Sequence, residues 1–416
     1  MKRLGYRKSR KGCARCKQRR VKCDEKVPCT ACWKHRVPCS LQSMTTDVPA
    51  RRREQLTIRQ KNQHHSSSNS SPSERPSGLF SYFSHFCPDY SVHRGPDVPL
   101  WTSEIELIHH YTANAHHTLY TPYSHAFTTL QSDVPQEALS HPFLLHQILA
   151  FSALHLAYLR GDGRHRYLIQ ASQHQGIAIS TINAMLRKPI EPDSCHALYA
   201  SSLFVAISAF GTFPSCDRYN DEFRPIESLV DIFVLMHGMH TILRSSDEII
   251  RNGPLKTLLS GCSCEPPKRP TCLARLAPRL HELLSFVKDQ MPTVDDEERR
   301  VLVEAIAAFI ESIARVTGMP SMTPTPEMRV IFGWPMKLST SYLALLREEN
   351  PLALAILSYY CVLLQSREPN QWMFTGWSDA LMKLIVDRAK GSTGEEVIQW
   401  PIDAIKEQKA KSVPTE

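Results

Sequence analysis

Six cysteines close to the N-terminus constrain the fold of this chain more than any other feature. Their spacing is C-x2-C-x6-C-x5-C-x2-C-x6-C, an internal repeat in which a C-x2-C pair is followed six residues later by a single cysteine. Both sulfurs of a C-x2-C pair can face one metal ion about 2.3 Å away, and the later cysteine then closes the cage. The predicted metal ligands are Cys13, Cys16, Cys23, Cys29, Cys32 and Cys39.

The number of ligands indicates which kind of metal site the repeat forms. Each half offers three thiolates, whereas a tetrahedral zinc ion takes four ligands. Six sulfurs fill the positions around two zinc ions only if two of them bridge, and Cys13 and Cys29 are the equivalent first cysteines of the halves. The sequence therefore predicts a binuclear Zn2Cys6 cluster that supplies the folding energy of a module too short for its own core. Disulfides and an iron–sulfur cluster are the less favoured alternatives.

The charge of the chain is divided very unevenly along its length. Residues 1–61 hold 19 lysines and arginines against 4 acidic residues, a net charge of +15, and the total of +8 leaves −7 for residues 62–416. Such a basic head suits a polyanionic partner, with nucleic acid favoured over an anionic membrane surface. Residues 1–11 offer only Leu4 and Tyr6 as large apolar side chains, and we identify neither a signal peptide nor an apolar run long enough to span a bilayer. We therefore expect a soluble intracellular protein without a membrane span.

Residues 12–39 resemble the fungal Zn2Cys6 (zinc binuclear cluster) transcription factors. The six cysteines agree with that family, as do the basic run between the second and third of them, the step from Cys23 to Asp24 and Pro28 in the loop. One departure is that Pro28 directly precedes Cys29, where the family usually has one more residue between the third and fourth cysteines. The resemblance implies a nuclear, sequence-specific DNA-binding protein that acts on the transcription machinery.

The same resemblance implies how the head binds double-stranded DNA. A helix over Ala14–Val21 would enter the major groove, with Arg19 and Arg20 facing base edges. Arginine can donate two hydrogen bonds to guanine, which suits the CGG-type half-sites of the family. Lys26 is expected to be a solvated charge. The predicted phosphate contacts are Arg15, Lys17, Lys22 and Lys34.

The chain is predicted to contain three parts: a Zn2Cys6 DNA-binding domain with a basic arm (1–45), a basic and then Ser/Pro-rich flexible linker (46–97), and an all-α regulatory domain (98–416). Residues 41–61 show no apolar heptad, and residues 62–78 contain 7 serines. A homodimer, if one forms, would therefore depend on the C-terminal domain or on DNA.

Residues from about 101 onward have helical periodicity without the alternation of strands. Ser103 and Glu106 form a capping-box pattern that predicts a helix through Leu119. Pro142 opens an apolar stretch that ends at Gly161–Gly163, which predicts a central helix because it is apolar on every face. The other predicted helices cover about 164–187, 194–210, 226–244, 273–288, 294–316, 339–347, 351–366 and 371–389.

An ordered set of motifs in this region resembles the regulatory domain of fungal sterol-uptake control factors and their relatives. The set includes the stretch from His141, Gly333-Trp-Pro335, the stretch from Asn350 to Tyr360, Gly376-Trp377 and Trp400-Pro401. The resemblance implies control of a metabolic gene set, for which we favour a secondary-metabolite biosynthetic gene cluster. The alternatives are a sterol-responsive regulator, whose domain would bind a small hydrophobic ligand, and a zinc-cluster adaptor without base readout.

Three further residue groups are open to a functional and a structural interpretation, and the structural one is favoured for each. Histidines at 109, 110, 116 and 117 are more typical of helix surface and core than of a metal site. Cysteines at 262, 264 and 272 are more typical of unliganded loop thiols than of a second zinc site or a redox switch, because the set lacks a fourth ligand. The aromatic and methionine residues of 371–389, which could line a lipid pocket, are more typical of core. These aromatic and methionine residues are Trp372, Met373, Phe374, Trp377 and Met382.

The chain contains no GxSxG, GxGxxG, P-loop or HExxH motif, so we do not expect an enzyme.

Overall fold

The computed structural model describes residues 13, 16–17, 23–26, 29–34, 100–119, 125–216, 223–258, 272–289, 295–317 and 325–412. The chain divides into two compact units, residues 1–73 and 74–416. Throughout the described ranges helices are the only regular elements, which confirms the expected combination of a small cysteine-rich module and a large all-α region. The predicted linker over 46–97 lies outside the described residues.

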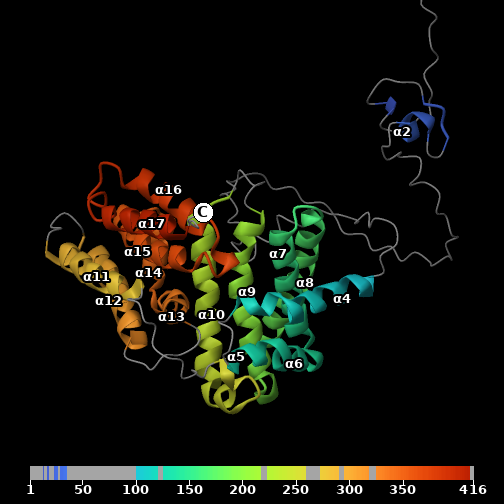
Figure 1. The fold of residues 1–416 in the computed structure, drawn as a ribbon, viewed down its shortest axis with the longest axis horizontal. Helices are drawn as coiled ribbons and strands as arrows, with labels where there is room; N and C mark the ends of the chain where they lie inside the picture. The colour runs from blue at the N-terminus through green and yellow to red at the C-terminus, as the bar shows by residue number, and fades with distance from the viewer. Residues whose placement is uncertain are drawn as a thin grey trace, which may run out of the picture. The chain divides into compact units, whose positions relative to one another are not determined.

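The described part of the second unit is a succession of helices (Figure 1). Its first half contains α4 (Leu100–Ala113), η2 (Ala115–Thr118), α5 (His125–Thr128), the π-helical turn η3 (Thr129–Asp133), α6 (Val134–Ser140), α7 (Pro142–Leu159), α8 (Arg164–Leu186), η4 (Pro192–Ser194) and α9 (Cys195–Cys216). Its second half contains α10 (Pro225–Asn252), η6 (Lys256–Leu258), α11 (Cys272–Asp289), α12 (Asp296–Thr317), α13 (Pro326–Gly333), η7 (Pro335–Lys337), α14 (Thr340–Arg347), α15 (Pro351–Arg367), η8 (Trp372–Phe374), α16 (Trp377–Ala389) and α17 (Gln399–Ser412).

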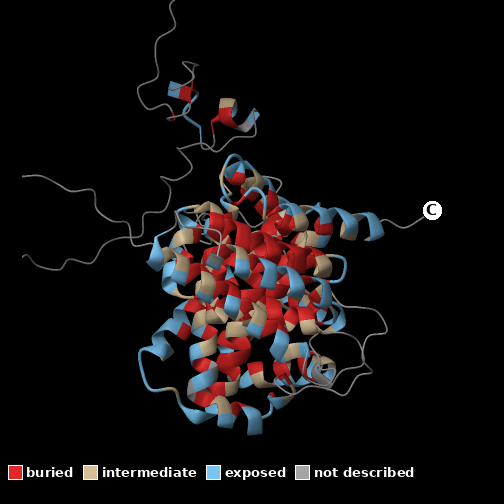
Figure 2. Cartoon of the chain, turned by 90° about the vertical axis from the view of Figure 1, so that its left-hand side faces the viewer, coloured by how far each residue is buried: buried red, intermediate tan, exposed pale blue. Residues whose placement is uncertain are grey.

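Helix α7 is central in the first half, as its apolar sequence predicts. It packs against α4, α8 and α9, and α9 packs in turn against α10 (Figure 1). The reversal between α7 and α8 uses Gly163, whose φ of 80° lies in the left-handed region that glycine adopts without strain. The interior of the domain is continuously buried (Figure 2). Burial of apolar surface on these helices is the main force that holds the unit together.

Helix α15 has the same central position in the second half. Its side chains are buried along almost its whole length. Asn350 begins the helix, because its side-chain oxygen accepts hydrogen bonds from the backbone N–H groups of Leu352 (3.0 Å) and Ala353 (3.1 Å). Two buried hydroxyls fix the surrounding layers: Tyr342 donates to the carbonyl of Ala353, and Tyr360 donates to that of Ile331, both over 3.0 Å.

The tryptophans of the Gly-Trp motifs are the largest fully buried side chains of the described chain. Trp334 stacks on Phe309, with 4.4 Å between the ring centroids, and its indole N–H donates to the carbonyl of Ala305. Trp377 donates in the same way to the carbonyl of Phe210 over 2.9 Å. A buried indole needs such a partner for its N–H. These motifs are therefore packing positions.

The aromatic and methionine residues of 371–389 are also core. Trp372, Met373 and Phe374 are buried in η8, and Trp377 and Met382 are buried in α16. The structural interpretation of this set is confirmed.

Several predicted helix boundaries are wrong for identifiable reasons. Helix α4 begins at Leu100, so Ser103 does not cap it; the Ser103 hydroxyl accepts a hydrogen bond from Gln170, and Glu106 pairs with Arg160 and Arg166. The helix predicted over 371–389 is broken at Gly376, where φ is 80°. The segments α5 to α6, α13 and α17 carry helices that the sequence pattern did not predict.

Two helices are long and apolar enough to cross a membrane, which corrects the expectation that the chain has no run of that length. They are Pro142–Leu159 and Pro192–Cys216, and 72% and 78% of their apolar windows are buried inside the domain. Both lie within the packed helices of the first half, so their apolar surface already has protein partners.

Histidines of the first half form buried pairs. His110 Nε2 lies 3.1 Å from His155 Nδ1, and the two Nδ1 atoms of His146 and His174 are 2.9 Å apart. His116 donates from Nδ1 to the carbonyl of Tyr111. Among the described residues, the clusters of three or more metal-ligating side chains consist of the N-terminal cysteines and Asp24 and include none of these histidines. The favoured interpretation of the histidines at 110 and 116 as packed residues therefore agrees with their surroundings.

Gly211 on α9 is a position where the packing leaves no room for a side chain. A Cβ atom there would lie 2.6 Å from the Trp372 ring, which is itself held by His155, Tyr158 and Phe151. We expect Gly211→Ala to destabilise the protein by about 1–3 kcal/mol in urea unfolding. Gly176→Ala is the matched control on α8, where an added Cβ meets nothing within 4 Å. The control substitution should raise the free energy of unfolding by about 0.5–1 kcal/mol. Equal effects of the two substitutions would contradict this account.

The buried histidines predict a pH dependence of stability. Burial lowers the pKa of His110 to about 4 and that of His155 to about 3, from an ordinary value near 6.5. The unfolded chain therefore takes up protons first, so stability is full above pH 6.5 and falls toward pH 4, by up to about 1.4 kcal/mol per pH unit for each histidine. His155→Gln should reduce the slope of the urea midpoint against pH. His165→Gln, at an exposed position on α8, should leave it unchanged.

Candidate metal centre and nucleic-acid interface

Cysteines from both halves of the repeat meet at one point in the first unit. The sulfurs of Cys13, Cys16, Cys29 and Cys32 all lie within 4.8 Å of one another, and all four residues are buried. The Sγ–Sγ distance is 3.8 Å for Cys13 and Cys29, 3.6 Å for Cys13 and Cys32, and 3.6 Å for Cys16 and Cys29. Each of these three pairs joins one half of the repeat to the other.

The backbone folds in the same way around the two C-x2-C pairs. The N–H of Cys16 donates to the sulfur of Cys13 over 3.3 Å, and the N–H of Cys32 donates to the sulfur of Cys29 over 3.4 Å. These bonds explain how two cysteines with two residues between them can bind one ion, because a turn of this size directs both sulfurs to the same side. The sequence repeat is thus a structural repeat.

The remaining two predicted ligands are Cys23 and Cys39. Cys23 approaches the group from one side: its sulfur accepts the N–H of Cys13 over 3.3 Å, and its ligand atom lies within 4.8 Å of those of Asp24 and Cys29. Cys39 lies outside the described residues. The structure therefore assembles four of the six predicted ligands at one point and places a fifth beside them.

The sulfur geometry fits tetrahedral zinc. Two sulfurs that are each about 2.3 Å from one tetrahedral zinc ion are about 3.8 Å apart, close to the three distances given above. The electrostatics also require a cation. The N–H of Cys16 lowers the pKa of Cys13 to about 6, whereas burial raises that of Cys16 to about 12. One thiolate is therefore favoured without metal, but several buried thiolates together need positive charge.

A carboxylate that was noted only as part of the family pattern supports this centre. Asp24 accepts hydrogen bonds from the backbone N–H and the hydroxyl of Thr30, the first residue of α2 (Thr30–Lys34). These bonds also lower the pKa of Asp24. Sequence reasoning missed this role, and an Asp six residues before a Thr that follows a ligand cysteine is the signal that could have found it.

The predicted DNA-binding residues are only partly described. Lys17 is exposed beside Cys16, and Lys34 is exposed at the C-terminal end of α2. Both can therefore reach a phosphate. The other predicted contacts, Arg15, Arg19, Arg20 and Lys22, lie outside the described residues.

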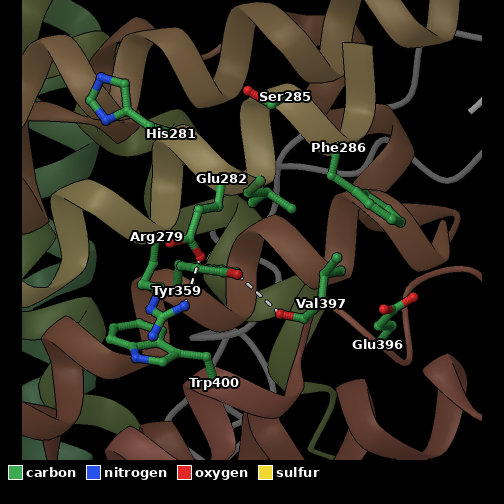
Figure 3. A pocket seen from close by; sticks show the side chains of 10 residues that line it. Arg279, His281, Glu282, Ser285, Phe286, Tyr359, Glu396, Val397 and Trp400 are labelled. Atoms are coloured by element: carbon green, nitrogen blue, oxygen red, sulfur yellow. Dashed lines mark hydrogen bonds and ion pairs between the residues drawn. The ribbon is translucent and has the colours of Figure 1, made fainter. Parts of the chain in front are cut away.

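The helical unit contains a cavity of about 670 Å3 between α11, α15 and the start of α17 (Figure 3). Charged and aromatic side chains line it, and they bind one another: Arg279 pairs with Glu282 over 2.7 Å and lies over the ring of Trp400. Tyr359 stacks on Trp400 and donates to the carbonyl of Val397. This lining differs from the mainly apolar walls of pockets that bury hydrophobic ligands.

Comparison with known proteins agrees with both units. Residues 11–47 match the fungal Zn(2)-Cys(6) binuclear cluster domain, and residues 106–220 match the fungal specific transcription factor domain.

Similar proteins cover most of the chain. A Zn(2)-C6 fungal-type transcription factor of Gibberella zeae is 25% identical over 96% of this chain and 86% of its own length. The Zn(2)-C6 fungal-type transcription factor afumD of Aspergillus fumigatus is 26% identical over 86% of each. Sterol uptake control protein 2 of Candida albicans is 31% identical, but over only 27% of this chain and 15% of its own length. The chain thus contains a fungal Zn(2)-Cys(6) binuclear cluster domain and a fungal specific transcription factor domain, and the first two of these similar proteins are named as transcription factors, not as enzymes.

Proposed function

We propose that the protein is a nuclear, sequence-specific transcription factor whose head holds two zinc ions on six cysteines and whose helical body regulates its activity. The observation that carries the proposal is the approach of sulfurs from both halves of the repeat to 3.6–3.8 Å. We assign residues 1–45 to DNA binding, 46–97 to a linker and 98–416 to regulation.

The cross-contacts support Cys13 and Cys29 as the bridging ligands. Cys13 approaches Cys32 of the second half, and Cys29 approaches Cys16 of the first. A bridging sulfur must reach ligands of both halves, and these two do so. One zinc ion would take Cys23 with the first C-x2-C pair and Cys29, and the other would take Cys39 with the second pair and Cys13. When bound, two zinc ions would offset four of the six thiolate charges and fix the module.

The fixed module would present the helix over Ala14–Val21 to the major groove of DNA. Arg19 and Arg20 lie on this segment, between the second and third ligand cysteines, and we assign them to the guanines of a CGG-type half-site. The exposed Lys17 and Lys34 would contact phosphates and give affinity without sequence preference. An adaptor without base readout is the alternative that substitution of the two arginines tests.

The regulated genes are proposed to be a secondary-metabolite biosynthetic cluster. Three observations weigh against the sterol-responsive alternative. The likeness to the sterol uptake control protein covers only 27% of the chain, and the aromatic and methionine residues of 371–389 are core. The cavity beside Trp400 is lined by paired charges, which a hydrophobic ligand would have to desolvate.

The assignment of base readout predicts the behaviour of arginine variants. Arg19→Ala with Arg20→Ala should abolish selection of a CGG-type site from a random DNA pool, since each bidentate contact is worth about 1–3 kcal/mol of discrimination. Non-specific binding at low salt should persist. Lys26→Ala, at an exposed residue of the loop, is the control and should keep the selected sequence. Retained selectivity in the double variant would remove both arginines from base readout.

The assignment of target genes predicts where the protein binds in its own genome. Chromatin profiling of the tagged full chain should find it at promoters of clustered biosynthetic genes, and its deletion should lower their transcripts. Occupancy at sterol import and synthesis genes, with transcripts that respond to added sterol, would instead establish the sterol alternative.

A further inference from the structure

The loop between the third and fourth cysteines is closed by one side chain. Asp24, which follows Cys23, accepts the Thr30 N–H over 2.9 Å and the Thr30 hydroxyl over 2.5 Å. Thr30 directly follows Cys29. The two bonds therefore tie the residue after one predicted ligand to the residue after another.

The start of α2 explains why an acceptor is needed there. The first N–H groups of a helix have no partner within it, and the residue before the helix normally supplies one from its side chain. That residue is Cys29, whose sulfur already accepts the N–H of Cys32 and is also a predicted metal ligand. The carboxylate of Asp24 supplies the acceptor for Thr30 from across the loop.

The backbone beside Asp24 is shaped for this contact. Glu25 has a φ of 60°, in the left-handed region that residues with a Cβ rarely adopt. A residue in this conformation reverses the chain direction, and here the reversal directly follows the residue that faces α2. A rare conformation of this kind persists where surrounding interactions hold it.

The residue types that form this pair of bonds occur in one half of the repeat only. The residue that corresponds to Asp24, after the third cysteine of the other half, is Ser40, and the residue that corresponds to Thr30 is Ala14. Alanine has no hydroxyl to donate and serine has no carboxylate. The sequence of the other half therefore cannot supply a carboxylate and a hydroxyl at these two positions.

We propose that Asp24 and Thr30 form a clamp that positions Cys29 relative to Cys23 and slows the loss of the zinc ion these two cysteines share. The inference rests on the proposed binuclear cluster. Asp24 is a positioning residue, because it acts through Thr30 and the adjacent cysteines.

Zinc release from the full chain to a chromogenic chelator measures the clamp directly. Wild-type protein should release its two ions in two phases. Thr30→Val removes the hydroxyl without a change of charge, and Asp24→Ala removes both acceptor oxygens. Each should accelerate one phase about three- to tenfold, the range expected when a helix-capping bond is lost. Thr30→Ser keeps both donors and should release zinc like wild type, as should Lys26→Ala.

A spectroscopic measurement separates positioning from general loosening of the module. With cadmium-113 in place of zinc, the full chain should give two resonances. In Thr30→Val, the resonance of the ion on Cys23 should move more than that of the other ion. Equal movement of both, or equal acceleration of both phases of zinc release, would overturn the clamp.

The zinc content of the wild-type chain distinguishes the two possible failures. A content other than two ions per chain refutes the proposed cluster, whatever the variants do. Two ions in wild type, with wild-type release rates in both Asp24→Ala and Thr30→Val, refute the clamp alone. If Thr30→Val retains no zinc while Thr30→Ser retains two ions, the clamp is upheld in a stronger form.

Discussion

The attraction between metal cations and buried thiolates is the interaction on which the N-terminal unit depends. The buried cluster of its described residues consists of Cys13, Cys16, Cys23, Cys29 and Cys32, with Ala31 packed against it. Among these described residues no aliphatic core substitutes for the sulfurs. Because burial raises the pKa of Cys16 while a backbone N–H lowers that of Cys13, the group cannot ionise completely by itself. Folding of the head and metal binding are therefore one process.

The helical unit is held by apolar burial instead, and most of its charged residues lie at the surface, with Glu327 a buried exception. Its ion pairs, such as Arg300 with Glu297 and Glu304, are largely exposed and add little stability. The charged residues matter instead through their distribution along the chain. Residues 62–416 carry a net charge of −7, while residues 1–61 carry +15. The phosphate backbone of DNA attracts the first segment and disfavours the second. The total of +8 conceals this division.

The metal centre could be predicted from the sequence because the spacing of the cysteines determines which sulfurs can reach one metal ion. The cysteine interval that brings two sulfurs to one ion is the interval seen in the fold. The link between Asp24 and Thr30 escaped prediction, since it depends on a loop path that no periodicity encodes. In the body, the apolar stretch from Pro142 predicted a central helix correctly. Helix α17, with its Lys- and Glu-rich surface, lacks such a stripe and was missed.

The capping pattern at Ser103 shows a second limit of sequence reasoning. Its residue types are right for a helix start, but the neighbouring helix α8 presents Gln170 and Arg166 to the same side chains. Tertiary partners of this kind outweigh a local preference of about 1 kcal/mol. Conversely, Asn350 with Pro351 does begin a helix, because both donors that Asn350 binds lie within α15 itself.

The contacts of η8 and α16 show that the region matched by the fungal specific transcription factor domain packs directly against elements that follow it in the chain. Trp372 stacks on His155 with 5.1 Å between the ring centroids, and its indole N–H donates to the Thr118 hydroxyl. The Trp372 ring also occupies the space beside Gly211, where a Cβ atom would clash with it. Trp377 donates to the carbonyl of Phe210. All four contacts reach back from beyond residue 370 into residues 106–220. Because packed cores do not deform continuously, a displacement of η8 would have to be accommodated by α7 and α9. The body is therefore mechanically continuous from its first half to its last helices.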